Sequence, residues 1–470
     1  MHRLGFFLGM LLAFCQVCAQ GVAEQLEALV ASSPVLKTSE VGITVFNLTK
    51  GTPVYAYQDQ KLYRPASIEK IITTVTALAE LGTSYTFDTR LAYTGTIGAD
   101  STLEGNLYVV GGFDPEFMED DLQRLTDAVH RAGINSIKGN LVADVSVMDS
   151  IYWGTGWAWD DTPNAFQPYL SPLMLNRGCV NVSVKPSQKG RRPEVEVYPK
   201  SDYYTIDNRA VCGIPHYGSL KINRDWLYNG NTIHITGNVG RPSGRTLNMF
   251  SSQDFFIQTF RYQLAQEHIA VDSLKYGVCP DTVTLLYKVS RPLEPVLKRA
   301  LKKSDNLSAE ALFYHLAIRG GGHKSIGIED AQKEIEHFMR HHIGKNPDDY
   351  SIVDGSGVSM YNYVSPELLL AYLKYAYAHQ EVFHPFYEAL PIAGVDGTLR
   401  YRMRKEKAFR NVRAKTGTVK GVSSLAGYVR AGNGDMLAFV IINQNVMSGR
   451  KAHRQVRSAT PPPPSSVLGA

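Results

Sequence analysis

Ser67 and Lys70 lie three positions apart where an apolar pattern predicts the start of a helix, so their side chains are expected on one face. A serine hydroxyl becomes a nucleophile when a neighbouring base takes its proton, and a neutral lysine can be that base. The ordinary lysine pKa is about 10.4, so burial and a second cation would have to lower it. The helix N-terminus would also favour an oxyanion beside Ser67. Alone the pattern is weak, because an ordinary helix start with a surface lysine looks the same.

Two further motifs follow along the chain. Ser304-Asp305-Asn306 could relay a proton, although the same residue types also cap a helix predicted over 308–319. Lys415-Thr416-Gly417 offers a cation for a carboxylate, a hydroxyl, and a glycine that lets a substrate backbone approach. Its alternative is a charged strand end beside a turn. In this order the three motifs match a known catalytic constellation.

Helices and strands on both sides of a long central block would position these motifs. Helical apolar spacing predicts the helices, and short apolar runs between turn residues predict the strands. In chain order we expect a helix over 22–31, strands over 42–47 and 54–57, a helix from Pro65 to Gly82, helices over 292–303, 308–319, 328–342 and 365–378, and strands over 411–418, 424–430 and 436–443.

The central block, from about 84 to 290, has a different pattern of apolar and turn residues. Short strand-like segments dominate it, with one helix at about 253–268. This predicts one or two β-rich domains inserted into a larger one. The strand-like segments are 107–110, 180–184, 194–198 and 232–235.

Composition and the two ends of the chain limit the class of protein. The 470 residues are 44% hydrophobic and 20% charged, which excludes wholesale disorder. A net charge of +5 without a block of like charges does not favour a nucleic-acid partner. Residues 1–19 resemble a secretory signal peptide, which predicts an exported, periplasmic protein. Cys15 and Cys18 are poor lipidation candidates, and peripheral membrane contact stays open. A Pro-rich tail over 451–470 is expected to be disordered.

Three cysteines remain after signal removal: Cys179, Cys212 and Cys279. They allow at most one disulfide within the chain, and a Cys179–Cys212 bridge stays open. His337 and His341 are four apart on a predicted helix, but neighbouring charges favour a solvated face, so no metal site is predicted.

The motifs resemble those of the penicillin-binding peptidases, and more closely the low-molecular-mass class C D-alanyl-D-alanine carboxypeptidases/endopeptidases. That group is similar in its large insert between the first two motifs, here from Lys70 to Ser304. The resemblance covers about residues 40–445. Further stretches that look like the family are 111–115, 156–161, 354–357 and 393–399.

The resemblance implies an α/β (α+β) class, the penicillin-recognising serine transferase fold, with a five-stranded antiparallel sheet flanked by helices and a β-rich inserted region. It assigns the peptidase domain to 20–83 and 290–450, and the insert of one or two domains to 84–289. No metal or organic cofactor is expected. The implied partners are peptidoglycan stem peptides, with β-lactam antibiotics as inhibitors.

The resemblance also implies a role for each motif residue. Ser67 would attack the D-Ala-D-Ala or cross-link peptide bond, with Lys70 as general base. Ser304 would pass the proton to the leaving amine, and Asn306 would orient the acyl chain. The Lys415-Thr416-Gly417-Thr418 strand would bind substrate: Lys415 and Thr416 hold the carboxylate, and the N–H groups of Ser67 and Thr418 form the oxyanion hole.

Two departures from the family stand out. Met360 occupies a position where an arginine is expected, which puts side-chain recognition in question. Residues 450–457 are nearly all polar, so the closing helix of the fold is expected to be short, loose or absent.

Other interpretations stay open on the sequence alone. A β-lactamase or esterase on this scaffold would need an extra base for deacylation, and no clear candidate is visible. A silent peptidoglycan-binding protein would have no need of all the motif residues. Carboxypeptidase and endopeptidase action are not separated. Ser356 in its Gly loop is interpreted as a turn residue, while Trp157 and Trp159 could line a sugar groove or simply pack.

Overall fold

The computed structural model describes residues 21–319 and 325–446 of the chain. These residues fall into two compact units, one within 21–71 and 363–446 and the other within 72–319 and 325–362. The predicted signal peptide, the Pro-rich tail and the segment 450–457 lie outside the described residues.

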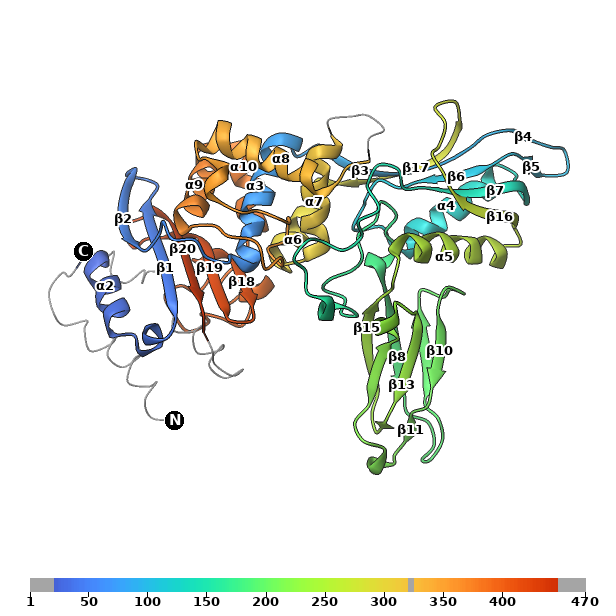
Figure 1. Cartoon of the computed structure of the whole chain (residues 1–470), viewed down its shortest axis with the longest axis horizontal. Coiled ribbons are helices and arrows are strands. Elements are labelled where there is room, and N and C mark those ends of the chain that lie inside the picture. The colour runs from blue at the N-terminus through green and yellow to red at the C-terminus, as the bar shows by residue number, and fades with distance from the viewer. Residues whose placement is uncertain (1–20, 320–324, 447–470) are drawn as a thin grey trace. The chain divides into compact units, whose positions relative to one another are not determined.

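The first unit is built on one five-stranded antiparallel sheet (Figure 1). Its strand order joins the two ends of the chain, because the last strand pairs with the first. In sheet order the strands are β18 (Arg413–Val419), β19 (Val422–Arg430), β20 (Met436–Gln444), β1 (Glu40–Asn47) and β2 (Thr52–Tyr57). The expected five-stranded antiparallel sheet is confirmed, and β19 and β20 are consecutive antiparallel strands within it.

Helices cover both faces of this sheet. Val22 and Leu26 of α2 (Val22–Ser32) join the apolar cluster on the β1 face that Ile43 lines. On the other face, a Cβ at Gly42 would lie 2.7 Å from Pro366 at the start of α9 (Pro366–Ala378), so the strand and the helix are in close contact. The second helix there, α10 (Gln380–Ala389), was not predicted. β19 and β20 are buried along nearly their whole length, as central strands covered on two faces should be.

The second unit contains a seven-stranded mixed sheet and three small sheets. In the large sheet β6 and β7 are parallel, and α4 (Glu119–Arg131) makes the crossover between them. We predicted strands here but not α4, although its buried residues recur at helical spacing. The strands are β3 (Thr86–Tyr93), β4 (Thr96–Ile97), β5 (Thr102–Glu104), β6 (Leu107–Val110), β7 (Ser136–Asp144), β16 (Ala270–Tyr276) and β17 (Thr284–Pro292).

The small sheets carry the remaining strands of the central block. They are β8 (Cys179–Lys185), β9 (Glu194–Tyr198) and β15 (Ser243–Asn248); β10 (Thr205–Asn208), β12 (Lys221–Arg224) and β13 (Thr232–Thr236); and β11 (Val211–Cys212) with β14 (Asn238–Val239). The helix α5 (Ser252–Gln266) packs its Phe255, Phe256 and Phe260 into the core of this block. The expected β-rich inserted region is confirmed, with one helix more than expected.

Helices α3 (Lys70–Leu81), α6 (Leu293–Lys302), α7 (Asn306–Ile318) and α8 (Ile328–Phe338) complete the described chain, and a π turn, Met339–Ile343, follows α8. Within the second unit α7 is buried on all sides, and its polar side chains therefore need internal partners.

His315 of α7 shows how one such partner set is built. Its Nε2 lies 3.0 Å from the carbonyl oxygen of Gly112, and its Nδ1 lies 2.8 Å from the hydroxyl of Tyr85. A carbonyl can only accept, so Nε2 carries the proton and Nδ1 accepts from the tyrosine. Burial lowers the pKa of His315 to about 4, which keeps the folded ring neutral at ordinary pH.

We expect the protein to lose stability as the pH falls from 6.5 toward 4. In this range the unfolded histidine binds a proton that folded His315 does not, which removes about 3 kcal/mol of unfolding free energy. Urea unfolding across this range checks the value. A His315→Gln variant keeps a donor and an acceptor but does not titrate, so its pH dependence should be shallower; equal slopes would contradict the assignment.

Candidate active site

Ser67 lies in a single 3₁₀ turn, η3 (Ala66–Glu69), that leads directly into α3. Ala66 has a φ of +50°, a strained conformation of the kind that gathers at functional sites. Ser67 is half-buried, whereas Lys70 is fully buried. Lys70 Nζ donates a hydrogen bond to Ser67 Oγ over 3.1 Å, so the expectation that the two side chains share one face is confirmed.

Strand β18 comes very close to this turn at Gly417. Gly417 pairs with Ser424 of β19, and Ser424 Oγ donates to the Pro65 carbonyl oxygen over 2.7 Å. A Cβ on residue 417 would lie 2.7 Å from the same carbonyl oxygen and 3.1 Å from the Ile68 nitrogen. Only glycine permits this approach, so the Lys-Thr-Gly strand is held against the Ser67 turn.

Lys415 brings a second amine to the same site. It is fully buried, and its Nζ donates to the Thr416 carbonyl oxygen over 2.7 Å. Burial, together with the charge of Lys70, lowers the pKa of Lys415 well below its ordinary value. The Thr416 hydroxyl donates to the Thr398 hydroxyl over 2.8 Å, which ties the 393–399 stretch to β18. Thr418 is exposed.

The Ser304-Asp305-Asn306 motif lies in the second unit, between α6 and α7. Asp305 is the N-cap of α7, because its Oδ1 accepts from the Ser308 N–H over 2.8 Å. Ser304 has a φ of +58°, so the chain turns sharply just before the cap. The helix-capping interpretation is thus correct for Asp305, the middle residue of the motif.

Asn306 is held by a segment of the central block. Its Nδ2 donates to the Phe166 carbonyl oxygen and to Gln167 Oε1, in each case over 3.0 Å. Both partners follow the 156–161 stretch that resembled the family. The central block therefore supplies the direct support of this motif residue.

The structure thus brings the predicted site residues together in two groups. One group, in the first unit, consists of Ser67, Lys70, Lys415, Thr416, Gly417 and Thr418; the other, in the second unit, consists of Ser304 and Asn306.

Comparison with known proteins assigns the family. A model of the D-Ala-D-Ala carboxypeptidase 3 (S13) family matches residues 22–461. The chain belongs to this family. It is therefore an enzyme, a serine-type D-Ala-D-Ala carboxypeptidase, and the predicted family and activity class are confirmed.

The sequences of individual relatives align with this S13 carboxypeptidase over most of their length. D-alanyl-D-alanine carboxypeptidase DacB of Haemophilus influenzae is 29% identical over 86% of this chain and 85% of its own. The D-alanyl-D-alanine carboxypeptidase of Actinomadura sp. (strain R39) is 28% identical over 89% of this chain and 80% of its own. The crystal structure of penicillin binding protein 4 (dacB) from Haemophilus influenzae superimposes with a TM-score of 0.79 at 25% identity, covering 92% of this chain and 99% of that one. The fold class is confirmed.

The 354–357 stretch of the S13 carboxypeptidase forms a loop around a buried carboxylate. Asp354 accepts hydrogen bonds from the N–H groups of Gly357 and Ser359, each over 2.7 Å, and from Trp157 Nε1 over 2.8 Å. Ser356 is buried in this loop. The two family-like stretches 156–161 and 354–357 are therefore one structural unit, and the packing interpretation is correct for Trp157.

Trp159 behaves differently from Trp157. It is 67% exposed and stacks on Trp226, with ring centroids 5.1 Å apart. Trp157 therefore lies in the core and Trp159 at the surface, so the two neighbouring tryptophans do not share one role.

The other candidate features carry no site among the described residues. The rings of His337 and His341 lie 4.4 Å apart, but no group of three metal-ligating side chains occurs in 21–319 and 325–446. Cys179, Cys212 and Cys279 are free thiols, so the Cys179–Cys212 bridge is not formed. Over the same ranges no helix combines the length and apolar character that crossing a membrane requires.

Sequence reasoning missed the residues that support the motifs. Ser424 fixes the Pro65 carbonyl, and Gln167 holds Asn306. Neither belongs to a motif, and each acts on a residue more than a hundred positions away in the chain. Their only signal was proximity to stretches that resembled the family.

Proposed function

We propose that Ser67 is the nucleophile of this carboxypeptidase and that Lys70 is its general base. The observation that carries the proposal is the 3.1 Å hydrogen bond from Lys70 Nζ to Ser67 Oγ, made by a fully buried lysine. A base must lie within hydrogen-bond reach of the proton that it takes, and this pair satisfies that condition. Repulsion between the amines of Lys70 and Lys415 favours one of them being neutral.

The reaction then runs in two halves. Ser67 Oγ attacks the carbonyl carbon of the D-Ala-D-Ala bond while Lys70 takes its proton. Ser304 then accepts that proton from Lys70 as it gives its own to the departing amine, and the C–N bond breaks. Asn306 orients the acyl chain of the ester formed on Ser67. Water then attacks that ester, the proton of the water returns to the Ser67 oxygen, and the shortened peptide leaves.

Strand β18 and the Ser67 turn would bind the substrate together. The N–H groups of Ser67 and Thr418 form the oxyanion hole, and the close approach of β18 at Gly417 supports this geometry. Lys415 and Thr416 hold the terminal carboxylate through hydrogen bonds.

The substrates that we propose are peptidoglycan stem peptides outside the cytoplasm, consistent with a secretory signal at residues 1–19. A cross-link carries the same D-alanyl carbonyl, so endopeptidase action can share the site. A β-lactam carbonyl would acylate Ser67 in the same way; the Haemophilus influenzae protein of similar fold is named as penicillin binding. We assign the peptidase domain to 20–83 and 290–450 and the insert to 84–289.

Mass spectrometry of defined peptidoglycan fragments tests the proposal. Pentapeptides should lose one alanine, or cross-linked dimers should become monomers, and the product pattern tells which activity dominates. The same protein treated first with benzylpenicillin is the control and should release nothing. Turnover that survives this block would place the reaction elsewhere. A folded protein with no turnover at all would favour the silent binding protein, and rapid release of opened penicillin would favour a β-lactamase.

A Gly417→Ala variant should lose about 100-fold in its rate of acylation by penicillin, since a displacement near 1 Å at a reacting centre has effects of this size. The added Cβ would meet the Ser424 hydroxyl at 2.1 Å and the Pro65 carbonyl at 2.7 Å, so the Ser67 turn must shift. Gly240→Ala is the matched control, because a Cβ there meets nothing within 4 Å. Equal acylation rates of the two variants would contradict the tight fit.

A further inference from the structure

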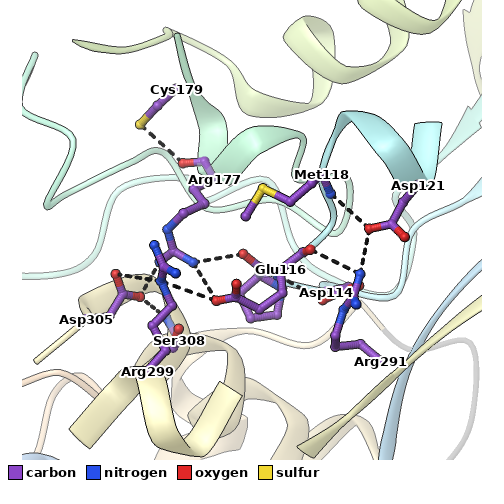
Figure 2. Close-up of polar contacts among 11 residues, drawn as sticks. Asp114, Glu116, Met118, Asp121, Arg177, Cys179, Arg291, Arg299, Asp305 and Ser308 are labelled. Atoms are coloured by element: carbon purple, nitrogen blue, oxygen red, sulfur yellow. Dashed lines mark hydrogen bonds and ion pairs between the residues drawn. The ribbon is translucent and has the colours of Figure 1, made fainter. Parts of the chain in front are cut away.

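A network of ion pairs in the second unit ends on the middle residue of the Ser304-Asp305-Asn306 motif. Figure 2 shows Arg177 between two carboxylates, Glu116 and Asp305. Its Nη1 lies 2.8 Å from Glu116 Oε1 and donates to the Pro115 carbonyl oxygen over 3.0 Å, while its Nη2 pairs with Asp305 Oδ1. The guanidinium therefore joins the 114–118 loop to the start of α7.

The Arg177 side chain is largely buried, and its backbone conformation is unusual. Its side chain is only 14% exposed, and its backbone lies in the left-handed region with φ +64°. Asn176 before it also has a positive φ, of 47°, and its Nδ2 donates to the Cys179 carbonyl oxygen over 2.9 Å. A non-glycine residue with a positive φ raises the free energy of the folded backbone, and here two such residues follow each other. Backbone strain of this kind gathers at functional sites, where it fixes the direction of a side chain.

The Asp305 carboxylate makes both a helix-capping hydrogen bond and an ion pair. It caps α7 through Ser308, and it receives Arg177. Burial alone would raise the pKa of Asp305, but Arg177 and the hydrogen bonds from Ser308 outweigh it and lower the pKa. Arg299 contributes less, because its Nε is 3.9 Å from Asp305 Oδ2 and its side chain is 39% exposed. Arg177 is thus the main partner of this charge.

We propose that Arg177 is a positioning residue for the reaction: by holding Asp305, it sets where Ser304 and Asn306 present their side chains. The inference rests on the roles proposed above for those two residues. Asn306 is also hydrogen-bonded to the 166–167 segment, so residues of the central block contact the motif at two consecutive positions, Asp305 and Asn306. An Asp305 carboxylate without Arg177 could turn away, and the peptide units on both sides of it would follow.

The test compares three arginine variants of the full chain. Arg177→Gln should lower the acylation rate by penicillin about 10- to 100-fold with little change in KM for a peptide substrate. Arg177→Lys should recover part of the rate, because a lysine can reach one carboxylate but cannot bridge two. Arg291→Gln is the matched control: Arg291 is also largely buried and pairs with Asp114 and Asp121, but it does not touch Asp305. It should lose similar stability and keep its acylation rate.

A double-mutant cycle separates position from stability. Asp305→Asn keeps the cap but not the charge, so it should mimic Arg177→Gln, and the double variant should be no slower than either. Additive effects, or an equal loss in Arg291→Gln, would overturn the proposal. If instead Asn306→Ala acylates at the wild-type rate, the role proposed for the motif fails, and this result is distinct from a failure of Arg177.

Discussion

A chain with Ser67 replaced by alanine is expected to form no covalent adduct with a penicillin. In the proposed reaction the hydroxyl oxygen of Ser67 forms the ester, and Lys70 donates a hydrogen bond to that atom. Intact-protein mass spectrometry after incubation with benzylpenicillin measures the result directly. The wild-type chain should gain the mass of one penicillin, and Ser67→Ala should gain none. Release of alanine from pentapeptides should disappear with the adduct.

Ser356→Ala is the matched control for this experiment. Ser356 is a serine of the glycine-rich stretch 354–357, which also resembled the family, but it is buried and its hydroxyl is 3.3 Å from the Asp354 carboxylate. That variant should still gain the adduct. An adduct on Ser67→Ala, mapped by peptide digestion to another serine, would remove Ser67 from the reaction. Thermal unfolding of each variant shows whether the protein is still folded.

Much of the site could be predicted because its chemistry is local in the chain. Ser67 and Lys70 are three residues apart, so helical spacing alone places them on one face. Gly417 follows Lys415 on a predicted strand, and the apolar runs of the two strands after it predict a sheet. The strands of this sheet were equally visible, since they are short apolar runs between turn residues. The resemblance then supplied the strand number of the sheet, which no local pattern contains.

The remaining features depend on contacts between distant residues. Arg177 and Asp305 are 128 positions apart, and nothing in either sequence neighbourhood marks them as a pair. The helix α4 was overlooked because the short strands around it set the expectation for the whole block. Trp157 and Trp159 could not be told apart until Asp354, far along the chain, was seen to accept from the first. Side-chain partners of this kind follow from tertiary packing, which a single sequence does not specify.

Replacement of Lys70 by methionine is expected to slow acylation by about 10²- to 10⁴-fold, the usual contribution of a positioned general base. Methionine fills a similar volume without an amine, so Ser67 would keep its place and lose its proton acceptor. Since Lys70 is fully buried, removing its amine also removes the cost of burying it. Stability should therefore hold or rise while the chemistry fails, which a general loss of structure cannot produce.

Stopped-flow acylation with a fluorescent penicillin and thermal unfolding together check this result. Lys61→Met is the control, because Lys61 is an exposed lysine shortly before the same turn and should change neither quantity. Loss of Lys70 also removes a charge that lowers the pKa of Lys415. Lys415 should then bind a proton more readily and hold a substrate carboxylate at least as well, so KM should stay constant or fall while kcat collapses. A rise in KM at constant kcat would instead make Lys70 a binding residue, and Ser67 would need another base.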